Sequence, residues 1–218
     1  MKKMLITIDG PAGSGKTTIS RLLADRLGYR YVDTGALYRA VALAAHGAQI
    51  DPEDDDALAC LCGGLTLDFA MGQGGTRLLA GGLDVTDLIR TPEVAMMASK
   101  VSARPVVREF LLSLQRRIGL ARAAVFEGRD MGTVVFPDAD LKFFLIASPE
   151  VRARRRFLEM GEGGGQTLAQ VAADMQRRDA NDTGRKLAPL VAADDAIKID
   201  STALSIEEVV RRMTSLIS

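Results

Sequence analysis

The sequence has little of the chemistry that sulfur and imidazole provide. Two cysteines, Cys60 and Cys62, and one histidine, His46, occur in 218 residues. Two thiols two positions apart form neither a disulfide framework nor a zinc site, so we expect structural thiols that are buried or half-buried. His46 stands beside Gly47 where a helical pattern ends, which favours a place at a helix terminus. The shortage of histidine argues against His-based acid–base catalysis and against metal sites built from several histidines.

An excess of charge of one sign and long apolar runs are also lacking. Lys+Arg and Asp+Glu number 28 each, which leaves no overall basic footprint for nucleic acid. The apolar runs are far shorter than the roughly 20 residues that span a bilayer. The short run after Met1-Lys-Lys does not have the layout of a signal peptide. We therefore expect a cytoplasmic protein without nucleic-acid or membrane partners, with one substantial core and room for a small inserted subdomain.

A glycine-rich stretch, Gly10-Pro-Ala-Gly-Ser-Gly-Lys16-Thr17, is the strongest motif in the chain. Residues 4–8 before it are typical of a buried strand, and residues 18–28 after it of an amphipathic helix that ends at a glycine. This strand–loop–helix context predicts a P-loop, whose glycines let the backbone and its N–H groups approach a polyphosphate. A nucleoside triphosphate is therefore expected to contact Gly10, Pro11, Ala12, Gly13, Ser14, Gly15, Lys16, Thr17 and Thr18.

Two side chains of this loop have expected partners. Lys16 would bridge the β- and γ-phosphates, and the hydroxyl of Thr17 would bind Mg²⁺ directly. The motif alone fits a kinase, a GTPase or a motor equally well, so the acceptor has to be read from the rest of the chain.

Strand and helix patterns alternate along the chain. Residues 29–32, 123–126, 141–147 and 196–200 predict further strands. Helices are predicted after Asp33 or Thr34 as the N-cap, over 92–121 and over 150–160, and two more begin at capping boxes, Thr167 with Gln170 and Ser205 with Glu208. This pattern predicts an α/β fold in three layers, with helices on both faces of a parallel five-stranded sheet that binds ligands at the carboxyl ends of its strands.

Residues 65–90 interrupt the alternation. The pieces 65–69, 76–80 and 83–85 are short and strand-like, and Gly-rich turns separate them, which predicts a small antiparallel meander. We therefore expect one domain with a core (about 1–60, 92–150 and 187–218), an antiparallel insertion (about 61–91) and a helical lid (about 151–186). The acidic run 53–56 is interpreted as a solvated helix start.

Polar residues gather in four groups, at 33–39, 127–130, 152–156 and 177–185. We place them in the loops at the strand ends and in the lid. Phosphoryl transfer needs positioning and charge stabilisation, and a planar guanidinium pairs bidentately with phosphate. Arginines 152, 155 and 156 can share one helix face, and Arg155 is expected at ATP; a solvated helix face is the alternative. For Tyr38 the alternative is core packing, and for Arg129 beside Asp130 a local ion pair.

These groups resemble the bacterial cytidylate kinases, a branch of the nucleoside monophosphate kinases. The matching stretches are 8–16, 33–39, 127–138, Arg178-Asp179 with Asp182 and Arg185, and 200–202. The stretch Glu127-Gly-Arg-Asp-Met-Gly-Thr-Val-Val-Phe-Pro-Asp138 is particular to that family. The predicted insertion is similar to the enlarged monophosphate-binding region of these enzymes. The resemblance implies a P-loop kinase fold. It also implies transfer of the γ-phosphoryl group of ATP, with Mg²⁺ as cofactor, to CMP or dCMP.

The resemblance also implies the residues that bind CMP. Cytosine recognition falls on Ser99, Arg108 and Asp130, where Ser99 and Arg108 flank a helix start. Other contacts are implied for the phosphate, the sugar and the rest of the acceptor site. At position 34 many relatives have Ser, and Thr keeps the hydroxyl while adding a methyl group. The full set is Thr34, Tyr38, Arg39, Ser99, Arg108, Arg129, Asp130, Arg178 and Asp182.

Four residues are expected to take part in the transfer itself. Arg178 and Arg185 would close on the transferring phosphate, and Lys16 and Arg129 complete the catalytic set. Asp33 would orient the Mg²⁺ ion through a water. A monomer is expected, because every helix pattern has one apolar face and none is left over.

Two other functions stay open at this point. One is a different small P-loop kinase, of UMP, AMP or shikimate, which the P-loop and lid alone cannot distinguish. The other is a nucleotide-dependent switch, which would need a partner-binding surface. The 127–138 stretch and the 65–90 insertion favour the cytidylate kinases over the other kinases. The sequence has no apolar stripe or basic patch that suggests the partner-binding surface of a switch.

Overall fold

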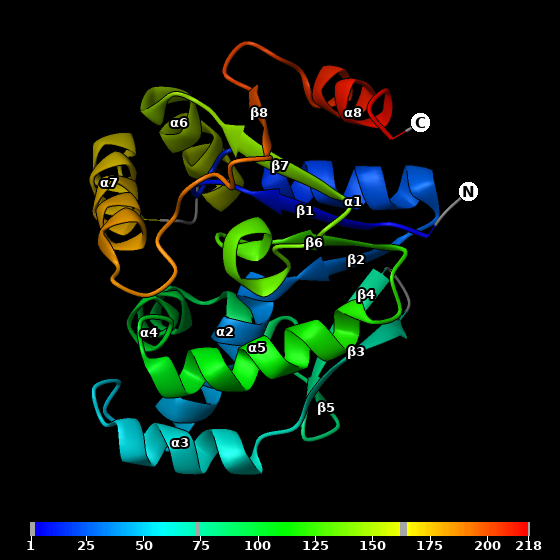
Figure 1. Ribbon diagram of the computed structural model, residues 1–218. Helices are drawn as coiled ribbons and strands as arrows, with labels where there is room; N and C mark the ends of the chain where they lie inside the picture. The colour runs from blue at the N-terminus through cyan, green and yellow to red at the C-terminus, as the bar shows by residue number, and fades with distance from the viewer. Residues whose placement is uncertain (1–2, 73–74, 162–164, 218) are drawn as a thin grey trace. The chain divides into compact units, whose positions relative to one another are not determined.

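The computed structural model describes residues 3–72, 75–161 and 165–217 (Figure 1). The chain divides into two compact units. Met1–Val32 and Ala121–Ser218 form what we call the parallel-sheet unit, and Asp33–Leu120 forms what we call the helical unit. Within the described ranges, no helix combines the length and the apolar character needed to cross a membrane.

The parallel-sheet unit is built on five strands in the order β2-β6-β1-β7-β8. The central strand β1 pairs in parallel with β6 on one side, where Ile6 faces Val125, and with β7 on the other, where Ile6 faces Leu141. The strand bounds are β1 (Leu5–Asp9), β2 (Arg30–Asp33), β6 (Ala124–Glu127), β7 (Leu141–Ile146) and β8 (Ile197–Asp200). The predicted strands are confirmed, with bounds that shift by at most one residue.

Helices α1 (Lys16–Leu27) and α8 (Ile206–Thr214) pack on this sheet through one apolar cluster. Ile19 and Leu23 of α1 and Val209 of α8 meet the buried strand residues there. Figure 1 shows α1 in blue and α8 in red. Helix α1 ends at Gly28, which has the left-handed φ of 63° that favours glycine at this position. The prediction that the helix ends at this glycine is confirmed.

Helices α6 (Pro149–Met160) and α7 (Leu168–Gly184) pack against each other. Ala153 of α6 and Val171 and Met175 of α7 form their shared apolar cluster, which the side chain of Ala12 also contacts. Both predicted capping boxes are present, at Thr167 for α7 and at Ser205 for α8. These local hydrogen bonds explain why the two helix starts could be located from the sequence.

A single turn of π-helix, Met131–Val135, follows β6 and was not predicted. Its N–H groups bond five residues back, from Val135 to the carbonyl of Asp130 at 3.2 Å and from Phe136 to that of Met131 at 2.7 Å. Such turns are rare and have no repeating apolar pattern, so the sequence offers no signal for them. They are found most often at functional sites.

The helical unit combines a three-stranded antiparallel sheet with four α-helices. The helices are α2 (Thr34–Gly47), α3 (Asp55–Gly64), α4 (Pro92–Val101) and α5 (Pro105–Gly119), with a 3₁₀ turn at Leu88–Arg90. The strands β3 (Leu67–Gly72), β4 (Gly75–Ala80) and β5 (Leu83–Asp84) lie in the order β3-β4-β5. The antiparallel meander and the α/β class with its parallel five-stranded sheet are confirmed.

Two features of this unit differ from the expectation. The helix expected over 92–121 is two helices, because Pro105 lacks an N–H and disfavours helical backbone at the residue before it. The small sheet also shares one apolar core with the helices around it, where Leu67 and Leu78 meet Leu37 and Leu111. The compact unit is therefore larger than the segment 61–91, while the finer division into core, insertion and lid stays a prediction.

We expect Leu23→Ala to lower the free energy of unfolding by about 2 to 5 kcal/mol, because it leaves a cavity beneath α1 at a fully buried position. Urea unfolding followed by circular dichroism measures the change. Leu216→Ala, at a position that is 45% exposed, is the control and should change it by less than about 0.5 kcal/mol. Equal losses in the two variants would contradict the placement of α1 on the sheet.

Candidate active site

The loop between β1 and α1 is fixed by close backbone packing at two glycines. At Gly10, with a φ of 146°, a Cβ atom would collide with the carbonyl oxygen of Leu145 in β7. At Gly13, with a φ of 70°, a Cβ would lie 2.8 Å from the carbonyl oxygen of Arg152 in α6. Gly15 is the N-cap of α1 and has a φ of 89°. The positive φ values match the conformation that the P-loop prediction required.

Lys16 is the buried cation of this loop, and 4% of the residue is exposed. Its Nζ donates to the carbonyl oxygen of Pro11 at 2.7 Å. Burial, helped by the positive charge of Arg129, lowers the pKa of Lys16 to about 7, while Glu127 and Asp9 act in the opposite direction. A buried cation of this kind gains most from an anionic ligand, because the ligand supplies the charge that water no longer provides.

Thr17 lies beside a buried carboxylate, Glu127, which belongs to the predicted polar group 127–130 but was given no role of its own. Its Oγ1 donates to Glu127 Oε1 at 2.7 Å, and the hydroxyl of Tyr31 donates to the other carboxylate oxygen at 2.6 Å. A hydroxyl and a carboxylate at a strand end are oxygen donors that fit Mg²⁺. Among the described residues no three His, Cys, Asp or Glu side chains cluster as a metal cage. The donor set therefore fits an ion that keeps waters and arrives with a polyphosphate.

Three of the predicted site residues meet around one carboxylate. Arg129 Nε donates to Asp182 Oδ2 at 3.0 Å, and Arg185 Nη2 lies 3.7 Å from Asp182 Oδ1. Asp182 also acts on the charge of Lys16, so four of the predicted residues share one electrostatic environment. Arg178 lies on the exposed surface of α7. The 177–185 group, which falls in the predicted helical lid, occupies the end of α7, because that helix continues to Gly184 and has Arg185 as its C-cap.

A pocket of about 400 Å³ opens beside the P-loop. Gly15, Thr18 and Arg155 line one part of it, and Ser201 and Leu204 another. Arg155 donates to the carbonyl oxygen of Ser201 at 2.7 Å and to its hydroxyl at 3.1 Å. The arginine and the loop after β8 therefore form one wall next to the phosphate-binding backbone. Ser201 was not predicted as a site residue.

The arginines of α6 serve different purposes. Arg152 is buried and donates to the carbonyl oxygen of Ala12 at 3.1 Å, and it pairs with Asp179 of α7 at 2.7 Å. It therefore joins the P-loop to both helices. Arg156 is exposed and pairs with Glu159 on its own helix. The expectation that residues 152, 155 and 156 share a face is wrong for Arg156, which turns to solvent as Arg154 does.

In the helical unit, the predicted residues Asp33, Thr34 and Arg39 lie at the start of α2. Asp33 caps this helix by accepting from the backbone N–H of Ala36 at 3.0 Å, and it pairs with Arg39 at 2.9 Å. Thr34, the first residue of the helix, is buried. Both carboxylate oxygens of Asp33 therefore accept hydrogen bonds from protein groups. Its role toward a metal stays a prediction.

Arg108 links two further predicted positions of the helical unit. Its guanidinium lies over the ring of Tyr38, with 5.7 Å between Cζ and the ring centroid. Its Nη1 donates to the carbonyl oxygen of Ser102 at 3.1 Å, and the Ser102 hydroxyl donates to the carbonyl oxygen of Ser99 at 3.0 Å. The structure thus connects Ser99, Arg108 and Tyr38 through the junction of α4 and α5. Tyr38 is partly buried against the apolar core of the unit.

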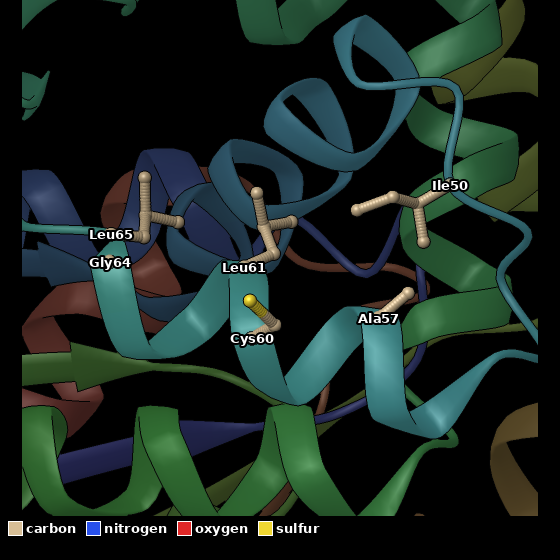
Figure 2. Close-up of a pocket in the computed structure, with 6 residues that line it drawn as sticks. All are labelled: Ile50, Ala57, Cys60, Leu61, Gly64 and Leu65. Carbon is tan, nitrogen blue, oxygen red and sulfur yellow. The ribbon is translucent and has the colours of Figure 1, made fainter.

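A pocket in the helical unit has a different character (Figure 2). It measures about 490 Å³ and is lined by Ile50, Ala57, Cys60, Leu61, Gly64 and Leu65, none of which offers a charged group to an anion. Of the two thiols, Cys62 is buried as expected, and burial raises its pKa. Cys60 is exposed, so the expectation was wrong for it. His46 lies in the last turn of α2, as expected.

The P-loop after the first strand of a parallel sheet and the cluster of buried charges around it define a P-loop kinase fold. A solved structure of shikimate kinase from Bacteroides thetaiotaomicron has this fold, with a TM-score of 0.50, 14% identity and coverage of 98% of both chains. An uncharacterized protein from Eubacterium ventriosum has a TM-score of 0.54 at 12% identity, again over 98% of both chains. Identities this low show the fold alone.

The chain belongs to the cytidylate kinase family, whose family model matches residues 6–218. A cytidylate kinase from Geobacter sulfurreducens is 54% identical over 98% of this chain and 92% of its own length. A cytidylate kinase from Enterococcus faecalis is 46% identical over 100% of this chain and 96% of its own. These matches confirm the resemblance inferred from the sequence.

Arg155→Ala should weaken ATP binding about tenfold, because the pocket wall at Ser201 loses its charged hydrogen bonds. Isothermal titration calorimetry with ATP measures the dissociation constant. The matched control is Arg154→Ala, which removes the exposed neighbouring arginine and should leave the constant unchanged. Similar losses in both variants would show that net charge matters here and that the pocket wall does not.

Proposed function

We propose that this chain catalyses the reversible transfer of the γ-phosphoryl group of ATP to CMP or dCMP, which gives ADP and CDP or dCDP. The observation that carries the proposal is the match to proteins named cytidylate kinase over nearly the whole length of both chains. The P-loop and the buried charges at Lys16 support the donor half of the reaction. No general base is needed, since the acceptor is already a phosphate oxyanion.

The donor half of the site uses groups of the parallel-sheet unit. The N–H groups at the start of α1 and the ammonium of Lys16 would bind the β- and γ-phosphates, where the helix dipole also favours anions. The pocket beside Arg155 would hold the adenine. Thr17 and Glu127 would hold Mg²⁺, with Asp33 acting through a water as a further candidate. The ion supplies positive charge to the phosphate oxygens when it is bound.

Arginines would stabilise the transferring phosphate. Arg129 and Arg185 both face Asp182, so their positions are held before any nucleotide binds. Preorganised positive charge of this kind costs no reorganisation during the reaction. Arg178, on the same helix as Asp182, is the fourth catalytic candidate with Lys16. Closure of residues 151–186 would exclude water, so that ATP is not simply hydrolysed.

The acceptor residues are proposed in both units. In the parallel-sheet unit, Asp130 would read the cytosine and Asp182 the sugar. In the helical unit, Ser99 and Arg108 would also read the base, and Tyr38 and Arg39 would hold the phosphate, with Thr34 beside them. These roles rest on the family resemblance of the matching stretches. We further propose that the protein is a cytoplasmic monomer that uses Mg²⁺ with ATP.

A coupled assay of ADP production should show kcat/KM for CMP and dCMP at least about tenfold above that for UMP, AMP, GMP and shikimate. The panel tests the acceptor directly, because every candidate kinase would use the same donor. Lys16→Met is the control and should lose activity with all acceptors, since it removes charge from the donor site. A preference for any other acceptor would sink the proposal, and nucleotide binding without turnover would favour a switch.

Asp130→Ala should lower kcat/KM for CMP about 10-fold to 100-fold and leave the dissociation constant of ATP nearly unchanged, because it removes a charged hydrogen-bonding group from the cytosine. Steady-state kinetics and calorimetry measure the two quantities. Asp138→Ala, at the exposed end of the same stretch, is the control and should change neither. Equal losses for CMP and ATP would argue against a role of Asp130 in reading the base.

A further inference from the structure

Asp9 is a buried carboxylate that the mechanism above does not use. It is the last residue of β1, directly before the P-loop, and 4% of it is exposed. Its Oδ1 accepts from the backbone N–H of Met131 at 2.9 Å, and its Oδ2 accepts from that of Gly132 at 2.8 Å. Both donors are the first residues of the π-helical turn. One side chain therefore binds two successive N–H groups of a rare backbone conformation.

The turn is attached to β1 on both sides of Arg129 and Asp130. On the near side, the N–H of Gly128 donates to the carbonyl oxygen of Ile8 at 3.1 Å. On the far side, the N–H groups of Met131 and Gly132 donate to Asp9. Arg129 and Asp130 are thus the only two residues between these attachments, and their backbone has little freedom left.

The other side of the turn is confined as well. At Gly132 a Cβ atom would lie 3.1 Å from Cδ of Lys142 and 3.2 Å from Oγ1 of Thr7. A side chain at this position would require the side chains of Lys142 and Thr7, or the turn itself, to shift by a few tenths of an ångström. Asp9 and Gly132 therefore both determine where the turn lies. Asp9 accepts two hydrogen bonds from it, and Gly132, which has no side chain, lets it approach Lys142 and Thr7.

Keeping this carboxylate ionised in the core has a cost. Burial, together with the nearby charge of Asp130, raises the pKa of Asp9 to about 6, although the two N–H bonds and the charge of Lys16 lower it. The pKa of Asp9 in the folded protein lies above its ordinary value of 3.8. Above about pH 6 the ionised carboxylate therefore lowers the free energy of unfolding by its full amount, and this loss of stability disappears as the pH falls toward 3.8. A costly buried charge of this kind points to a functional role.

We infer that Asp9 is a positioning residue for the acceptor: its two hydrogen bonds hold the turn at Met131–Val135, and the turn holds Arg129 and Asp130 in register with the P-loop. The inference rests on the proposed function, which places these two residues at CMP. It assigns to the residue before the P-loop a part in acceptor selection. Asp9 would act through the turn and would not touch the nucleotide.

Two variants test the role of the turn. Asp9→Asn replaces one acceptor by an N–H₂ group that faces a backbone donor. Gly132→Ala crowds the turn against Thr7 and Lys142 without removing any charge near Lys16. Both should raise the dissociation constant and KM of CMP about 10-fold to 100-fold through misplacement of Asp130. Both should also reduce the preference for CMP over UMP, while the dissociation constant of ATP changes by less than about threefold.

Asp140→Asn is the matched control. Its carboxylate accepts from the backbone N–H of Leu5 at 2.7 Å and so binds the opposite end of β1, far from the P-loop along the strand. This variant should leave the constants for CMP and ATP unchanged. Unchanged CMP binding in Asp9→Asn and Gly132→Ala, or equal losses for CMP and ATP, would overturn the inference.

A second readout does not depend on the acceptor. Amide hydrogen exchange at Met131 and Gly132 should be faster in Asp9→Asn than in the wild type, and unchanged exchange would also overturn the inference. If the wild type prefers another monophosphate, the proposed function fails separately, and the same variants are then measured with that acceptor. Should Asp9→Asn not fold, Gly132→Ala carries the test.

Discussion

The buried charge of Lys16 is the constraint on which the parallel-sheet unit depends. A cation that is 4% exposed needs nearby anions, and they come from separate elements: Asp9 from β1, Glu127 from β6 and Asp182 from α7. Arg129 opposes them and helps to lower the pKa of Lys16. Strands β1 and β6 and helix α7 thus each place a carboxylate near the ammonium group of Lys16. An anionic ligand would raise the pKa of Lys16 and favour its charged form.

Most of the fold could be predicted because its signals are local. The strand before the P-loop, the glycine after α1 and both capping boxes depend on residues within one or two turns of each other. The break before Pro105 was missed because both segments beside it have apolar residues at helical spacing, such as Val94 and Ala98 before it and Val107 and Leu111 after it. The extent of the helical unit was not predictable, since its core joins segments that only tertiary packing brings together.

The site was predictable where backbone conformation or family resemblance determines the residue type, as at Gly13, Gly15 and Lys16. It was not predictable where partners are distant in sequence. Thr17 and Glu127 are 110 residues apart, and Asp9 and Met131 are 122 apart. Only the order of strands in the sheet, with β6 beside β1, makes them neighbours. Glu127 had one available signal, a carboxylate that ends a buried strand.

Gly10 and Gly15 are needed for different reasons, Gly10 for the packing of β1 beside β7 and Gly15 for the conformation of the loop. Gly10 has no space for a side chain beside the carbonyl of Leu145, whether or not a nucleotide is bound, so a larger residue there would disturb the pairing of β1 with β7. At Gly15 the nearest atom to an added Cβ is 3.5 Å away, and the strain is confined to the loop. In a genetic screen both substitutions would score as loss of function. Only the amount of protein left in the cell would tell a chain that misfolds from one that folds without activity.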